Sequence, residues 1–77
     1  MLATLLDIVA DVTEVERADL RPNDVVSQVG IDSLGISQVL VEAEIALAVE
    51  FDYDQLPNDW SELTLEELAE ALARSIL

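Results

Sequence analysis

Gly30-Ile31-Asp32-Ser33-Leu34 is the stretch that decides the fold, because it has the features of a helix start near the middle of the chain. Gly30 permits a tight turn with a positive φ, and Asp32 is a residue type that caps a helix by accepting from the free N–H groups of its first turn. Ser33 then falls at the first helical position, where the helix dipole favours a phosphate group. The residues alone leave two interpretations open: a structural cap pair, which is common at helix starts, or an anchor for a phosphate-linked group.

The helix that follows is predicted to run from Ser33 to about Glu50, and its apolar residues fall on two lines. At about 100° per residue, the face expected in the core carries Ile36, Val39, Leu40, Ala43, Ala46 and Leu47. The second line consists of Leu34, Val41, Ile45 and Val49. A helix of a small bundle buries one broad face, so we expect the second line to be exposed as a partner surface. The alternative is that this line packs under the long first loop.

Apolar spacing places another helix on each side of the central one. A stripe with the helical period predicts a helix over residues 2–14, followed by a long connection over residues 15–28 that contains turn residues. Near the other end of the chain, Thr64 and Glu67 have the spacing of a capping box. The helix that they open is expected to face the core with Leu65, Leu68, Ala69, Leu72 and Ile76.

Residues 51–57 are predicted to break the central helix, because they are rich in turn residues. Residues 58–62 follow as one short helical turn, with Trp60 packing inward. We therefore expect an all-α fold in a single domain over residues 1–77. It is a four-helix bundle of three main helices plus one short helix, with a long first loop.

Charge is the strongest compositional signal, with 17 acidic residues against three arginines and a net charge of −14. This balance argues against nucleic acid or an anionic membrane as a partner and favours basic protein surfaces; the alternative is that the acidity serves solubility. No apolar run is long enough to span a bilayer, and the first four residues lack the basic start of a signal peptide. We expect a discrete, monomeric, cytoplasmic protein.

Catalytic and metal-binding chemistry is poorly represented. The chain has no histidine and no cysteine, which removes the common nucleophile–base pairs and the imidazole and thiolate metal sites. The Asp52-x-Asp54 segment begins like a calcium loop, but the positions that follow lack the required glycine and ligands. We expect no catalytic residue, no metal site and no enzyme activity. If Ser33 has a chemical role, another protein must modify it.

The central motif resembles the G-x-D-S-L signature of acyl carrier proteins, and the helix order, the length, the acidity and the Leu56-Pro57 pair fit that family too. The resemblance implies that Ser33 receives 4′-phosphopantetheine from coenzyme A through a phosphopantetheinyl transferase. It implies that Asp32 assists this modification by helping the transferase to place its metal and the serine. Acyl groups would be held as thioesters on the thiol of the arm and presented to partner enzymes.

The resemblance also implies a partner surface on the central helix. Its expected members are Leu34, Gln38, Val41, Glu42, Glu44 and Ile45. The expected partners are the transferase and acyl-loading and acyl-processing enzymes with basic or apolar docking surfaces. Gly35, the long central helix and its rather apolar outer face depart from the housekeeping fatty-acid carriers. These departures suit a specialised pathway such as polyketide assembly.

Two alternatives belong to other classes of protein. An aminoacyl or peptidyl carrier of a nonribosomal-type pathway has the same fold, although such carriers more often have Gly-Gly-His-Ser or Gly-Gly-Asp-Ser where this chain has Gly-Ile-Asp-Ser. An interaction module of the death-fold or docking kind would carry no arm. In that case the exposed line through Leu34, Val41 and Ile45 would be the whole function.

Overall fold

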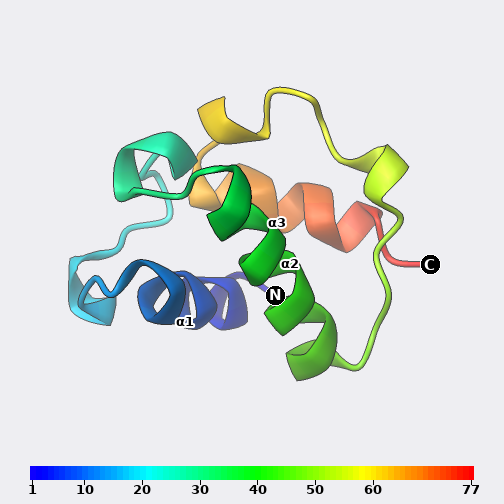
Figure 1. Ribbon diagram of the computed structural model, residues 1–77, viewed down its shortest axis with the longest axis horizontal. Helices are drawn as coiled ribbons and strands as arrows, with labels where there is room; N and C mark the ends of the chain where they lie inside the picture. The colour runs from blue at the N-terminus through cyan, green and yellow to red at the C-terminus, as the bar shows by residue number, and fades with distance from the viewer.

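The computed structural model describes all of residues 1–77 and is all-helical (Figure 1). Its α-helices are α1 (Leu2–Thr13), α2 (Ser33–Leu47) and α3 (Leu65–Arg74). Four single 3₁₀ turns lie in the connections: η1 (Arg17–Asp19), η2 (Val26–Val29), η3 (Tyr53–Gln55) and η4 (Trp60–Glu62). The expected all-α class is confirmed. The expected fourth helix is not confirmed, because the short element at Trp60–Glu62 is a 3₁₀ turn. The chain has three other turns of the same kind.

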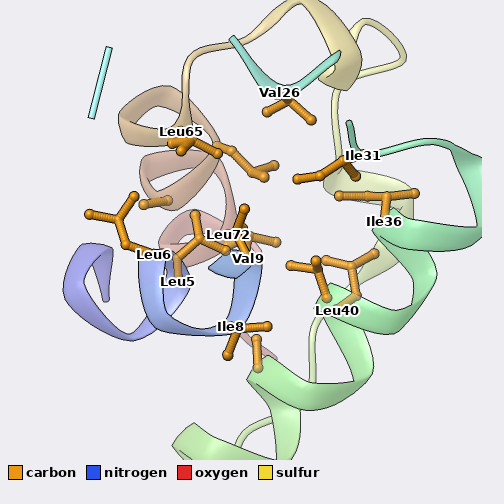
Figure 2. Close-up of a cluster of buried hydrophobic side chains, with 14 of the residues drawn as sticks. Leu5, Leu6, Ile8, Val9, Val26, Ile31, Ile36, Leu40, Leu65 and Leu72 are labelled. Atoms are coloured by element: carbon orange, nitrogen blue, oxygen red, sulfur yellow. The ribbon is translucent and has the colours of Figure 1, made fainter. Parts of the chain in front are cut away.

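One hydrophobic core joins the three helices and both long connections. In Figure 2 the labelled side chains of α1, α2 and α3 converge on one interior region. The core cluster comprises Leu5, Leu6, Ile8, Val9, Leu20, Val26, Ile31, Ile36, Val39, Leu40, Ala43, Phe51, Leu65, Leu68, Ala69 and Leu72. Trp60 packs against this cluster as expected, whereas Ala46 is exposed and Leu47 only half-buried. The buried face of α2 is therefore shorter than its sequence pattern predicts.

The first connection is fastened to the start of α3 by main-chain hydrogen bonds. The Val26 N–H donates to the Leu63 carbonyl at 2.9 Å. In the other direction, the Leu65 N–H donates to the Asp24 carbonyl and the Glu66 N–H to the Pro22 carbonyl, each at 2.9 Å. The first N–H groups of a helix have no partner within it, so the loop supplies acceptors that α3 lacks. Val26 is fully buried by this pairing.

The predicted capping box at the start of α3 is confirmed. The Glu67 N–H donates to Thr64 Oγ1 at 3.1 Å, and the Thr64 N–H donates to Glu67 Oε1 at 2.9 Å. Ile76 was expected on the core face of this helix, but it lies beyond its end and is exposed. It forms an isolated antiparallel bridge with Phe51, because the chain end pairs with the segment that follows α2.

Helix α2 ends at Leu47, about one turn before the expected Glu50. Ala48 adopts a left-handed conformation with φ 54°, and the Val49 N–H then donates to the Glu44 carbonyl at 3.1 Å, as in a Schellman motif. This sharp end lets Phe51 enter the core, where it is 4% exposed. Burial of an aromatic side chain outweighs the cost of one strained residue, which is of the order of 1 kcal/mol.

Replacing Ala48 by glycine is expected to raise the free energy of unfolding by about 1 kcal/mol, because glycine has no Cβ to strain the left-handed conformation. The matched change Ala46→Gly, at an exposed position inside α2, is expected to lower it by about 1 kcal/mol. Urea unfolding of both variants measures whether each substitution raises or lowers the free energy of unfolding. A loss of stability in Ala48→Gly would contradict the assigned end of α2.

Candidate functional site

The start of α2 is formed by a turn and a side-chain cap. Gly30 closes η2 with φ 95°, in the left-handed region that glycine enters without strain. Asp32 is the N-cap of α2, and its Oδ1 accepts a hydrogen bond from the Gly35 N–H at 2.7 Å. The bond satisfies one of the free donors of the first turn. The helix therefore begins at Ser33, where the sequence predicts it.

Two buried isoleucines hold this helix start in place. Ile31 is 3% exposed and Ile36 is 8% exposed, and both point into the core from either side of the cap (Figure 2). Ser33 and Leu34 lie between them in sequence and are exposed, Leu34 at 71%. Anchoring on both sides fixes the backbone of the motif while the Ser33 side chain remains accessible to another protein.

Gly35 lies under the capping carboxylate. A Cβ on this residue would come within 3.2 Å of Asp32 Oδ1 and 3.5 Å of Ile31 Cγ2. The contact with the oxygen is tighter than ordinary van der Waals packing, so a side chain here would displace the cap by a few tenths of an ångström. The absence of a side chain at Gly35 therefore allows the Asp32 carboxylate to lie close against the helix.

Ser33 combines an exposed side chain with unused main-chain donors. Its hydroxyl makes no hydrogen bond within the chain, and its carbonyl oxygen accepts from the Ser37 hydroxyl at 3.2 Å. The N–H groups of Ser33 and Leu34 have no acceptor within the chain, in contrast to those of Gly35 and Ile36, which donate to Asp32. Free N–H groups at a helix start favour a phosphate group. No histidine, lysine or cysteine is present to activate the hydroxyl.

The expected outward positions of α2 are mostly exposed. Val41 is 51% and Ile45 is 75% exposed, and Gln38 and Glu42 are exposed as well. Val49 differs, because it lies beyond the end of α2 and packs partly against the core. The second apolar line of the helix is thus a surface feature of this fold from Leu34 to Ile45, and the first loop does not cover it.

Glu44 is the one predicted surface residue whose side chain is engaged within the chain. Its Oε1 accepts from the Tyr53 hydroxyl at 2.6 Å, and its Oε2 accepts from the Phe51 N–H at 2.9 Å. The Tyr53 bond and then the Phe51 bond lower the pKa of the Glu44 carboxyl below 4.5. The same bond to Glu44 raises the pKa of Tyr53 above 10.0. Glu44 therefore ties α2 to the segment that follows it.

The sequence did not indicate that α1 contributes to the surface around the exposed line. Asp11 and Val12 of α1 line a hollow of about 490 Å³ together with Ser37, Gln38, Val41 and Glu42 of α2. No local pattern marks the two α1 residues, because their place depends on how α1 crosses α2. No group of histidine, cysteine, aspartate or glutamate side chains is arranged to hold a metal ion. No helix of the chain has the length and apolar character needed to cross a membrane.

Comparison with protein-family models assigns the chain to a known class of protein. The model of the family described as phosphopantetheine attachment site matches residues 3–72. The chain therefore belongs to this family of carrier domains, whose members hold 4′-phosphopantetheine covalently and are not themselves catalytic. Neither the curated proteins nor the solved structures yield a match. The resemblance to the acyl carrier protein family, which the central motif and its sequence context indicated, is confirmed.

The family's arm fits the residues at the start of α2. An ester on an exposed hydroxyl needs a side chain free of other bonds, and the phosphate needs donors that the chain leaves unused; Ser33 meets both conditions. Such an arm supplies a terminal thiol, the group that a chain without cysteine lacks. Carrier domains of this family imply a transferase that attaches the arm and biosynthetic enzymes that use it.

Glu44→Gln is expected to lower the pKa of Tyr53 toward 10.0, because it replaces the carboxylate that accepts the Tyr53 hydrogen bond by a neutral amide and removes the negative charge beside the hydroxyl. Tyr53 is the only tyrosine of the chain, so its titration can be followed by ultraviolet absorbance. The control is Asp54→Asn, which removes the charge of the next residue in the chain, a carboxylate that accepts no bond from Tyr53. Equal shifts in the two variants would contradict the assigned hydrogen bond.

The same pair fixes the pH window of its stabilising effect. The folded-state pKa of Tyr53 is raised, so its contribution is present below pH 10.0 and is lost as the pH rises through the raised value. The folded-state pKa of Glu44 is lowered, so its contribution is present above pH 4.5 and is lost as the pH falls through the lowered value. Tyr53→Phe should therefore reduce the free energy of unfolding at pH values between the lowered pKa of Glu44 and the raised pKa of Tyr53, and should not reduce it outside this range.

Proposed function

We propose that the chain is an acyl carrier protein in which Ser33 holds the 4′-phosphopantetheine arm. The single observation that supports this most is the free Ser33 hydroxyl beside two unused N–H groups, held between buried Ile31 and Ile36. The Ser37 hydroxyl is one turn further along the same helix, but it donates to the Ser33 carbonyl and lies away from the helix start. Ser33 therefore combines access with favourable electrostatics for a phosphate ester.

Asp32 has two roles in this proposal, one for each carboxylate oxygen. Its Oδ1 caps α2 through the Gly35 N–H, whereas its Oδ2 makes no hydrogen bond within the chain. The free oxygen is available to the metal ion that the transferase brings. Asp32 directly precedes Ser33 in the chain, so the structural and the chemical role depend on the same side chain.

The proposed partner surface is the exposed side of α2. Leu34, Val41 and Ile45 supply its apolar contacts, and Gln38 and Glu42 border them. Glu44 serves this surface indirectly, because its hydrogen bonds to Tyr53 and Phe51 hold the end of the helix. Partners of matching chemistry are acyl-loading and acyl-processing enzymes with basic and apolar docking surfaces.

The cellular role that we propose is a non-catalytic shuttle in polyketide or fatty-acid-type biosynthesis. Residues 1–77 act as one carrier domain, monomeric and cytoplasmic, that binds neither nucleic acid nor membrane. The net charge of −14 supports the last two points, because it repels anionic surfaces. The apolar outer face of α2 supports a specialised pathway rather than the housekeeping fatty-acid pathway.

Incubation with coenzyme A and a broad-specificity phosphopantetheinyl transferase is expected to raise the intact mass of the protein by one 4′-phosphopantetheine group. Ser33→Ala should abolish this increase, because it removes the proposed acceptor oxygen. Ser37→Ala is the matched control and should be modified like the wild type, since its hydroxyl lies on the same helix one turn away. An unmodified wild type, or modification of Ser33→Ala, contradicts the proposal.

Two substitutions of Asp32 separate its proposed roles in the same assay. Asp32→Asn keeps a side-chain oxygen for the cap, so the stability of the protein should change little while modification slows. Asp32→Ala should slow modification and also lower the free energy of unfolding by about 1 kcal/mol. Wild-type modification rates in Asp32→Asn would show that the charge of Asp32 has no part in the reaction.

The acyl and the aminoacyl alternatives differ in what loads the modified protein. Gly30-Ile31-Asp32-Ser33 favours the acyl type. We expect an acyl-ligating enzyme to add its acyl group to the holo protein, and an aminoacyl-adenylating enzyme to leave it unchanged. Intact mass follows both reactions. Loading by the second enzyme alone would assign the chain to the aminoacyl or peptidyl carriers.

A further inference from the structure

Gly35 is buried in the first turn of α2, where a glycine works against the helix that carries Ser33. Glycine destabilises a helix relative to alanine, because it loses more conformational freedom on folding. Its backbone is helical here and needs no positive φ. A residue that opposes its own element indicates a compensating gain elsewhere in the structure.

The gain lies in the space that Gly35 leaves to its neighbours. A Cβ on this residue would meet Asp32 Oδ1 at 3.2 Å, closer than ordinary van der Waals packing, and Ile31 Cγ2 at 3.5 Å, an ordinary contact. Asp32 Oδ1 is also the atom that accepts the Gly35 N–H at 2.7 Å. The missing side chain therefore matters more to the carboxylate than to the isoleucine.

Burial decides which group a methyl at position 35 would displace. Ile31 is 3% and Ile36 is 8% exposed, so both are held by the close packing of the core. Asp32 is exposed, and its carboxylate can move into solvent. The added methyl would therefore shift the carboxylate by a few tenths of an ångström and leave the core in place.

We propose that Gly35 is a positioning residue for the modification of Ser33: by carrying no side chain, it lets Asp32 hold its carboxylate where the transferase requires it. The proposal rests on the proposed function. Gly35 is buried, so it acts through Asp32 and not by touching the transferase. The carboxylate is one rigid planar group, so a displacement of Oδ1 also displaces Oδ2, the oxygen that the chain leaves free.

The size of the displacement sets the expected effect on the rate. A misplacement of about 1 Å costs a positioned reaction on the order of 100-fold. A few tenths of an ångström then correspond to a loss of about three- to fivefold. The general attraction between a carboxylate and a cation about 4 Å away changes by less than about a tenth over the same displacement. Placement is therefore the larger effect.

The test is a double-mutant cycle on the rate of modification by the phosphopantetheinyl transferase, measured as kcat/KM with coenzyme A in excess. Gly35→Ala should slow modification of the wild type about three- to fivefold. In the Asp32→Ala background the same change should alter the rate less than about 1.5-fold, because the added methyl then meets no carboxylate. A raised transferase concentration keeps the slow variants measurable.

Ala46→Gly is the matched control, since it makes the opposite exchange at an exposed position of the same helix, away from the cap. It should be modified at the wild-type rate, which separates the position of the carboxylate from the helix propensity of α2. Circular dichroism checks that each variant is folded. In urea, Gly35→Ala should unfold at a higher concentration than Asp32→Ala, because it weakens the cap without removing it.

Crystal structures of the wild type and Gly35→Ala in one crystal form provide a readout that does not depend on the transferase. The Asp32 carboxylate should be displaced, while Ile31 and Ile36 stay in place. An unmoved carboxylate would overturn the proposal.

The rate measurements separate this proposal from the carrier function. A wild-type rate in Gly35→Ala, equal slowing in both Asp32 backgrounds, or equal slowing in Ala46→Gly would overturn the role of Gly35 and leave the carrier function standing. A Gly35→Ala variant that does not fold would also overturn it, because the core and not the carboxylate would then meet the methyl. An unmodified wild type refutes the carrier function, and the positioning role with it.

Discussion

The pairing of residues 22–26 with residues 63–66 is the constraint on which the rest of the structure depends. Carbonyl groups of the first loop accept hydrogen bonds from the start of α3, and the Val26 N–H of the loop donates to the Leu63 carbonyl. A segment without regular structure thereby becomes part of the core. It buries Val26 completely and places η2, and through Gly30 it sets where α2 begins. A loop of this length would otherwise be mobile, because few local contacts offset its conformational entropy.

The site is a consequence of this anchoring. Ile31 and Ile36 bury their side chains on either side of the Asp32 cap, and the two residues between the cap and Gly35 have no interior to enter. Ser33 is therefore exposed on a backbone segment that is anchored on both sides. An exposed serine elsewhere on a protein surface would be of little interest. Here the exposure matters, because the free N–H groups beside Ser33 favour a phosphate.

Helix α2 has two faces with different purposes. One face belongs to the core, and the other carries Leu34, Val41 and Ile45 in contact with solvent. Exposed apolar residues of this size carry a cost in solubility, which the strong net negative charge offsets. The hydrogen bonds of Glu44 end this helix and turn the chain toward Phe51, so the length of the outer face is set by an interaction at its far end.

Local physics determined much of this protein before any tertiary contact. Helical periodicity, the Asp32 cap and the Thr64–Glu67 capping box are properties of neighbouring residues. The central motif, taken with the chain length, the acidity and the helix order, was enough to indicate the carrier family. Tertiary structure decided the rest. The sequence pattern could not end α2 at Leu47, because that end depends on Glu44 reaching residues seven and nine positions ahead. Nor could it place Asp11 opposite Glu42, because the crossing of α1 and α2 follows from how the whole core packs.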